Sequence, residues 1–147
     1  MKLKKYLFKN MLYILVVAWM VAIFYFSHQP VNKSSELSGG ISGLIVDKLE
    51  GVLKTDLDNG LFEHLTRKFA HFTEYMILGI LMYIVFSRNK VFSSKRMLVC
   101  VIICVLYAIS DEIHQYFVPG RAARVVDVII DSVGAIFGIY MTTLFTK

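Results

Sequence analysis

Acidic and histidine side chains interrupt three of the most apolar stretches of this chain, where ionisable groups are rare. The five are His71, Glu74, Asp111, His114 and Asp131. Carboxylates and imidazoles are the side chains that most often move protons in catalysis. If the chain is an enzyme, we expect Glu74, Asp111 or Asp131 to act as a general base, with a histidine as its proton partner.

Basic and other polar side chains flank the same stretches. Arginine presents a planar pair of donors that matches a phosphate or carboxylate, and lysine presents a point charge. The candidate ligand-binding residues are Arg67, Lys68, Glu112, Gln115, Arg121, Arg124 and Asp127. We expect the basic members to hold an anionic headgroup, which leaves the acids and histidines free for proton transfer.

Helical spacing sorts these candidates into faces, because residues three, four and seven positions apart lie on one side of a helix. The two sets with this spacing are Arg67, His71 and Glu74, and Arg124, Asp127 and Asp131. Two further pairs stand three residues apart, Asp111 with His114 and Glu112 with Gln115. Of these pairs we expect one to face the interior and the other to face the rim.

Other catalytic and metal signatures do not match. Ser110 lies in no G-x-S-x-G elbow. The D-E-I-H sequence at residues 111–114 differs from the H-E-x-x-H zinc motif, so a metal held by the two histidines and nearby acids is the weaker alternative. Cys100 and Cys104 are one helical turn apart in an apolar run, which favours simple packing. The prediction is a site without metal or cofactor.

The elements that position these residues are apolar segments of membrane-spanning length. Mean hydropathy is +0.61, and the four segments cover residues 11–27, 69–86, 97–117 and 125–145. Each approaches the roughly 20 residues needed to cross a bilayer as a helix, and an open sheet edge has no partners in lipid. The prediction is an all-α fold: one integral membrane four-helix bundle over residues 1–147.

The distribution of basic residues predicts which side of the membrane each loop and terminus lies on. They precede the first segment (Lys2, Lys4, Lys5, Lys9), fill the second loop (Arg88, Lys90, Lys95, Arg96) and end the chain (Lys147). Cytoplasmic loops are enriched in lysine and arginine. We therefore expect both termini in the cytoplasm, and we interpret the net charge of +5 as a topology signal, with no nucleic acid as partner.

The first extracytoplasmic loop, residues 28–66, is the only long connection. Apolar residues recur in it at three- and four-residue spacing between Leu37 and Leu53, which predicts an amphipathic helix on the outer leaflet or over the bundle. The last segment carries a G-x-x-x-G pair, Gly134 and Gly138. It favours close packing of a neighbouring helix, and a homo-oligomer through the same pair is the alternative.

Three of the acidic residues are expected at a similar depth in the membrane. At about 1.5 Å per residue, Glu74, Asp111 and Asp131 fall roughly 8–10 Å below the outer surface of the hydrocarbon. Ionisable groups at that depth cost about 2.5–3.5 kcal/mol each on insertion scales, so they should face the interior. A salt-bridge network that only holds the helices in register is the alternative to a functional site.

Three pieces of the sequence carry a family resemblance. They are Lys68-Phe69-Ala70-His71-Phe72-Thr73-Glu74-Tyr75 with Gly79; Asp111-Glu112 with Gln115-Tyr116-Phe117-Val118-Pro119-Gly120-Arg121; and Asp127, Asp131, Gly134 and Gly138. With them the chain resembles the VanZ-like family, from Arg67 to Gly138 above all. Asp131 stands where the family often has Asn, which adds a charge.

The resemblance implies a small integral membrane protein of bacteria, from a family associated with reduced susceptibility to teicoplanin-type lipoglycopeptide antibiotics. Our hypothesis is that an outward-facing site binds or modifies membrane lipids or a lipid-linked cell-wall precursor. A protein that shields such a target without chemistry is the alternative. A proton or ion transporter is less favoured, because the cytoplasmic halves of the segments have few polar groups.

Overall fold

The computed structural model describes residues 2–29, 39–40, 43–44, 59–88 and 95–146, with the backbone alone for residues 2–9 and 59. Four long helices account for nearly all of these residues: α1 (Lys2–Ser27), α3 (Asn59–Ser87), α4 (Arg96–Tyr116) and α5 (Val125–Phe145). Each contains a window long and apolar enough to cross a membrane. The predicted all-α membrane bundle is confirmed.

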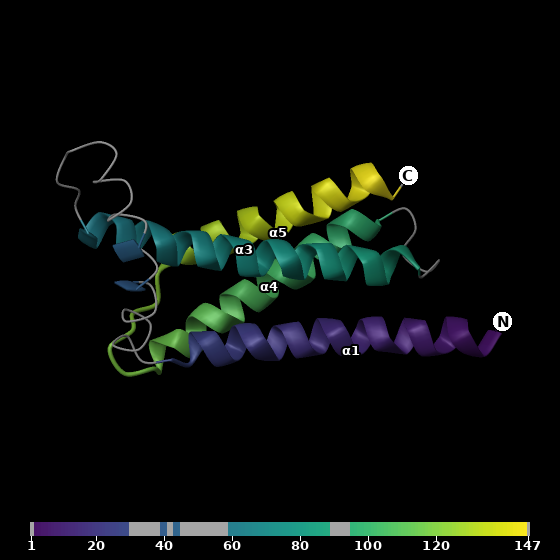
Figure 1. Ribbon diagram of the computed structural model, residues 1–147, viewed down its shortest axis with the longest axis horizontal. Coiled ribbons are helices and arrows are strands. Elements are labelled where there is room, and N and C mark those ends of the chain that lie inside the picture. Colours follow the sequence, from purple (N-terminus) through teal and green to yellow (C-terminus); the bar gives the residue numbers. More distant parts are fainter. Residues whose placement is uncertain (1, 30–38, 41–42, 45–58, 89–94, 147) are drawn as a thin grey trace.

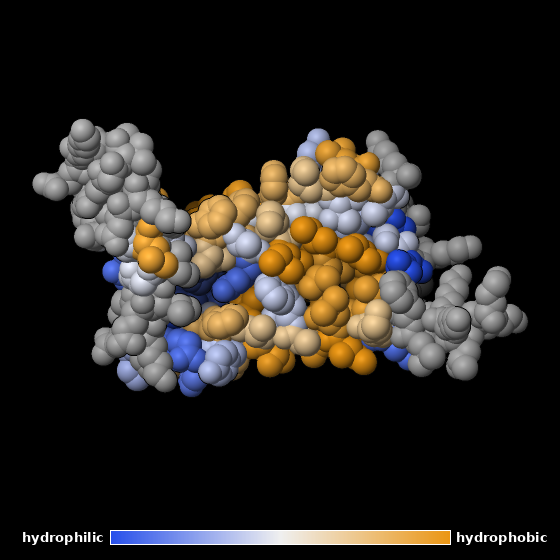
Figure 2. Space-filling view, viewed as in Figure 1, coloured by the Kyte–Doolittle hydropathy of each residue, from blue (hydrophilic) through white to orange (hydrophobic). Residues whose placement is uncertain are grey.

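Successive helices alternate in direction, so both chain ends lie at one end of the bundle (Figure 1). At the other end α1 and α4 finish and α3 and α5 begin; we call it the site end, marked by Ser27, Tyr116 and Val125. Mostly apolar side chains cover the middle of the face seen in Figure 2, and hydrophilic ones gather toward the two ends. This is the surface that a lipid bilayer solvates.

Helix bounds follow the apolar segments except at the starts of two helices, and the first of these is α1, which begins at Lys2 instead of residue 11. The fourth helix covers the predicted residues 125–145, whereas α3 begins at Asn59 instead of residue 69. Its first turns are polar, so hydropathy placed them in the loop, but a helix can run on into water. His64, Arg67 and Lys68 therefore stand on regular helix. The amphipathic helix expected between Leu37 and Leu53 falls almost wholly outside the described residues.

Helix α3 packs most extensively on α5, through glycines. A Cβ at Gly134 would meet the carbonyl oxygen of Phe72, and one at Gly138 would meet that of Met76. The missing side chains let the two backbones touch, as small residues do in membrane bundles. The G-x-x-x-G surface is thus filled by α3 of the same chain, and this seam sets α3 and α5 side by side at the site end.

Two long side chains tie α1 to the rest. The Trp19 indole N–H donates to the Glu74 carbonyl oxygen at 2.9 Å, and the Tyr107 hydroxyl donates to the Met20 carbonyl oxygen at 2.6 Å. Cys100 and Cys104 are free thiols buried in the core, which confirms the packing interpretation. Because α1 is fixed by these bonds, its last turn reaches the same level as the acids of the other helices.

Candidate functional site

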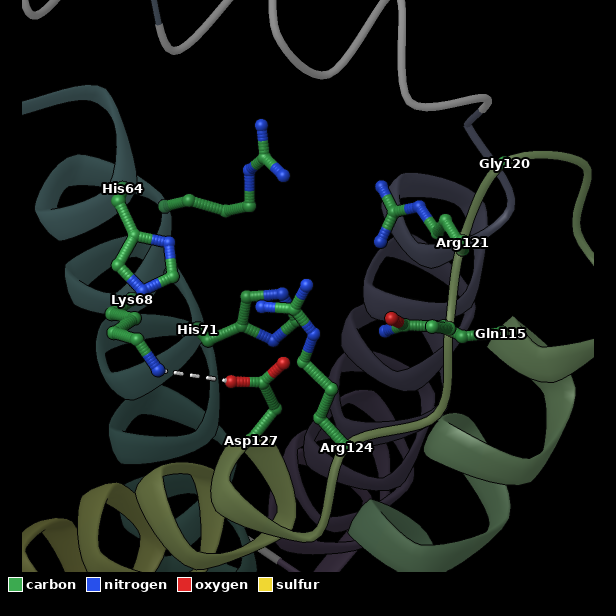
Figure 3. Close-up of a pocket in the computed structure, with 10 residues that line it drawn as sticks. His64, Lys68, His71, Gln115, Gly120, Arg121, Arg124 and Asp127 are labelled. Carbon is green, nitrogen blue, oxygen red and sulfur yellow. Dashed lines mark hydrogen bonds and ion pairs between the residues drawn. The ribbon is translucent and has the colours of Figure 1, made fainter. Parts of the chain in front are cut away.

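A pocket of about 180 Å³ opens at the site end. It is lined by His64, Arg67, Lys68, His71, Gln115, Gly120, Arg121, Ala122, Arg124 and Asp127. Figure 3 shows these side chains converging from α3, the end of α4, the α4–α5 connection and the start of α5. Four permanent cations and one carboxylate line it, so the pocket is strongly basic.

The turn between α4 and α5 positions the two arginines. Gly120 has φ 79°, a left-handed conformation that glycine adopts without strain, and Arg121 N–H donates to the Val118 carbonyl at 3.1 Å. Beyond it, the backbone N–H of Arg124 donates to the Glu112 carboxylate. The carboxylate of Glu112 thereby holds the first turn of α5 against α4.

Two of the four cations have acidic partners. Lys68 Nζ lies 3.3 Å from Asp127 Oδ1, the pair drawn in Figure 3. Arg67 Nη2 donates to Glu63 Oε1 at 3.0 Å, one turn earlier on α3. Both cations also line the pocket.

The other two cations have no acidic partner within the described parts of the chain. Arg121 donates from Nε to the Gln29 carbonyl oxygen at 2.9 Å, and the Arg124 guanidinium makes no hydrogen bond or ion pair with the described residues. Burial first, and the like charge of Arg67 next, lower the pKa of Arg121. Positive charges facing one another across a pocket favour an anion between them.

His71 lines the pocket, and the buried Asp131 lies beside it. His71 Nδ1 lies 3.3 Å from Asp131 Oδ1, which makes an ion pair when the imidazole is protonated. Asp131 is 0% exposed, and neither of its oxygens accepts a hydrogen bond from the described residues. The Tyr75 hydroxyl, also buried, is likewise without a hydrogen-bond partner there.

Asp111 belongs to a different arrangement, between α1 and α4. Its Oδ2 accepts from the Ser27 hydroxyl at 2.6 Å and from Gln115 Nε2 at 3.3 Å, and the same amide donates to the Ser27 oxygen at 2.8 Å. All three side chains are buried. The network closes α1 against α4 at the level of the pocket.

The expected pairing of faces on α4 is wrong. Asp111, Glu112 and Gln115 are all buried, and His114 alone of the four is partly exposed. Three sides of α4 are covered here because α1 as well as α3 and α5 pack against it. Spacing in one helix could not show how many neighbours that helix has.

His114 and Glu74 do not line the pocket. His114 Nε2 lies 3.1 Å from His28 Nδ1, and its ring stacks on Phe24 with centroids 4.2 Å apart, so it faces the last turn of α1. The Glu74 side chain is half-buried one turn below His71. Of the five candidates for proton transfer, His71 alone reaches the pocket wall, with Asp131 beside it.

Sequence reasoning missed several residues of this region: Ser27, His28, Glu63 and His64. The signal was present for the first two, because Ser27-His28 ends the first apolar segment at the level of the other polar groups. Among the described residues, no three histidine, cysteine, aspartate or glutamate side chains are grouped so that they could hold a metal ion.

The comparison with known families decides the relationship. The VanZ/LLP1 family matches residues 12–146, nearly the whole chain. The chain belongs to this family. With four helices of spanning length, it is a multi-pass membrane protein of a family linked to glycopeptide resistance. No curated protein and no solved structure matches it.

The segments that carry the family resemblance meet in the structure. Lys68 and His71 of the first segment, Gln115 and Arg121 of the second, and Asp127 of the third all line the pocket. The glycines of the third segment hold α5 against α3 below it. The shared pattern therefore maps onto a basic pocket and the helix seam that supports it.

Proposed function

We propose that this protein binds the anionic headgroup of a membrane lipid or lipid-linked cell-wall precursor, and acts on it, at the extracytoplasmic face of the bacterial membrane. The observation that carries the proposal is the charge of the pocket lining. Four cations meet one carboxylate there, and two of the cations, Arg121 and Arg124, lack an acidic partner among the described residues. Guanidinium groups suit phosphate oxygens because their donors lie in one plane.

The neighbouring surface suits the tail of such a ligand. Phe69, Phe117 and Val125 are 70%, 74% and 78% exposed, and each stands near residues of the pocket. Side chains of this size are exposed on a membrane helix where lipid covers them. A headgroup could enter the pocket while its hydrocarbon chain stays in the bilayer.

The opposite end of the bundle supports the orientation. Arg88, Lys95 and Arg96 stand between α3 and α4 there, and α1 begins there with a lysine-rich turn. Basic residues at short loops mark the cytoplasmic side. The site end would then face outward, with both termini inside.

Direct binding tests the proposal. Purified protein in nanodiscs of zwitterionic lipid is titrated with farnesyl diphosphate, an amphiphile with a phosphate headgroup. Arg124→Gln should weaken binding about tenfold, since one charge-assisted contact is lost. Arg88→Gln, an exposed cation at the opposite end, should bind as the unaltered protein does. Equal affinity for both variants, or no binding at all, would refute the basic pocket as a headgroup site.

A shield that covers such a lipid without changing it would use the same pocket. Mass spectrometry of lipids extracted from cells with and without the gene separates the two. A changed headgroup or precursor supports modification. Unchanged lipids together with altered glycopeptide binding support shielding, and Glu74→Gln or Asp111→Asn should then keep the resistance phenotype.

A further inference from the structure

The imidazole of His71 has two different sides. Nδ1 is buried and faces the Asp131 carboxylate at 3.3 Å. The residue also lines the pocket, and its side chain keeps 15% of its surface exposed. Because Nδ1 is turned inward, Nε2 is the nitrogen that a molecule in the pocket can reach.

Asp131 is placed to fix the state of that ring. A buried carboxylate beside Nδ1 favours the tautomer with the proton on Nδ1, which leaves the Nε2 lone pair toward the pocket. The same carboxylate stabilises the imidazolium that forms when Nε2 takes a proton. Among the described residues, the His71 imidazole at 3.3 Å is the charged or polar group that faces this carboxylate most closely, and no hydrogen bond from them holds either of its oxygens.

The walls supply the positive charge that a reaction at phosphorus needs. Two of these cations are Lys68 and Arg124, which both line the pocket. Lys68 stands about one turn before His71 on α3, and Arg124 stands at the start of α5 (Figure 3). Catalysis of phosphoryl transfer depends on positioning and on stabilising negative charge on the phosphoryl oxygens. A base facing into a cationic pocket is the arrangement that such a reaction requires.

We propose that His71, positioned by Asp131, is the general base that hydrolyses the terminal phosphoryl group of an anionic lipid bound in the basic pocket. The inference rests on the proposed function, because the headgroup must first bind. Asp131 is the positioning residue, and His71 is the catalytic one. Water is the second reactant, and it reaches the pocket from the outer aqueous phase.

In the proposed hydrolysis, His71 takes one proton from water and gives it to the leaving group. Water oxygen forms a bond to phosphorus as Nε2 takes one of its protons, and the bond from phosphorus to the lipid oxygen breaks. The electron pair stays on the lipid oxygen, which takes the proton from the imidazolium. Inorganic phosphate and the dephosphorylated lipid leave, and His71 returns to its neutral state.

The experiment measures phosphate release by the full-length protein in proteoliposomes. Two probes, farnesyl diphosphate and dioleoyl phosphatidate, distinguish a phosphoanhydride from a phosphate monoester, and release from either supports the proposal. His71→Asn should lower kcat by about 10²–10⁴-fold, with affinity for the probe within about twofold. His28→Gln, a histidine change outside the pocket, should keep the unaltered rate.

Two further measurements separate chemistry from folding. Asp131→Asn should lower kcat while KM stays the same, because the pocket walls are untouched. Imidazole added to His71→Ala should restore part of the rate, which a misfolded protein would not allow. If the probe binds but no phosphate is released, or if His71→Asn keeps full activity, the catalytic roles of His71 and Asp131 are ruled out while the proposed binding site is not. Absence of binding would overturn both.

Discussion

Two polar regions lie at the same level of this bundle, and they are built differently. Between α1 and α4, Asp111 Oδ2 accepts hydrogen bonds from Ser27 and Gln115, which also bond each other. Between α3 and α5, Asp131 has only the His71 imidazole at 3.3 Å and no hydrogen bond within the described chain. In the first region one oxygen of the acid is bonded and the other, Asp111 Oδ1, is not, whereas in the second region neither oxygen of Asp131 has a hydrogen-bond partner among the described residues.

The difference bears on the choice between a salt-bridge network that holds the helices in register and a functional site. A network that only holds helices in register should satisfy its own members, as the α1–α4 region nearly does. A site should keep polar atoms available for a ligand, at a cost in stability. The α1–α4 region fits the first description, and the region between α3 and α5 is where the proposed function can be tested.

Removing the acid of the closed network should have the larger effect on stability. Asp111→Ala leaves the buried Ser27 hydroxyl without its acceptor and removes one of the two hydrogen bonds that Gln115 Nε2 donates. We expect the free energy of unfolding to fall by about 1–3 kcal/mol, measured as a lower Tm in detergent. Asp111→Asn keeps an acceptor oxygen and should lose less. Equal Tm values for Asp111→Ala and Asp111→Asn would contradict the structural role of this carboxylate.

Removing the acid beneath the pocket should have a small effect on stability. Asp131→Asn takes away a carboxylate that is 0% exposed, and its partner His71 is neutral in the resting site, so no unpaired buried charge is left behind. We expect the free energy of unfolding to stay the same or rise by about 1 kcal/mol, while phosphate release is lost. A Tm drop as large as that of Asp111→Ala would place Asp131 among the structural groups.

Much of the fold and part of the candidate site could be predicted from the sequence. Apolar length predicted the four spans, and helical spacing predicted a shared face for Arg67 and His71 on α3 and for Arg124 and Asp127 on α5. All four line the pocket, whereas Glu74 and Asp131, predicted on the same faces, do not. These predictions succeed because a period of 3.6 residues is a local property of the chain.

The contacts between side chains of different helices could not be predicted in the same way. That Asp111 bonds Ser27, and that His114 turns to His28 and away from the pocket, depends on where α1 lies and how α4 is rotated. Those are set by packing over the whole bundle, including the glycine contacts of α5 and the Trp19 bond to α3. The polar start of α3 was missed because hydropathy marks where lipid ends and not where the helix ends.

The outward direction of the pocket is the central claim, and cysteine labelling tests it most directly. Ala123 is exposed beside the pocket, and Arg88 is exposed at the opposite end. In a chain whose two native cysteines are replaced by alanine, Ala123→Cys should react with a membrane-impermeant maleimide in intact cells, and Arg88→Cys only after permeabilisation. The reverse pattern would put the basic pocket in the cytoplasm and contradict a site for lipids of the outer leaflet.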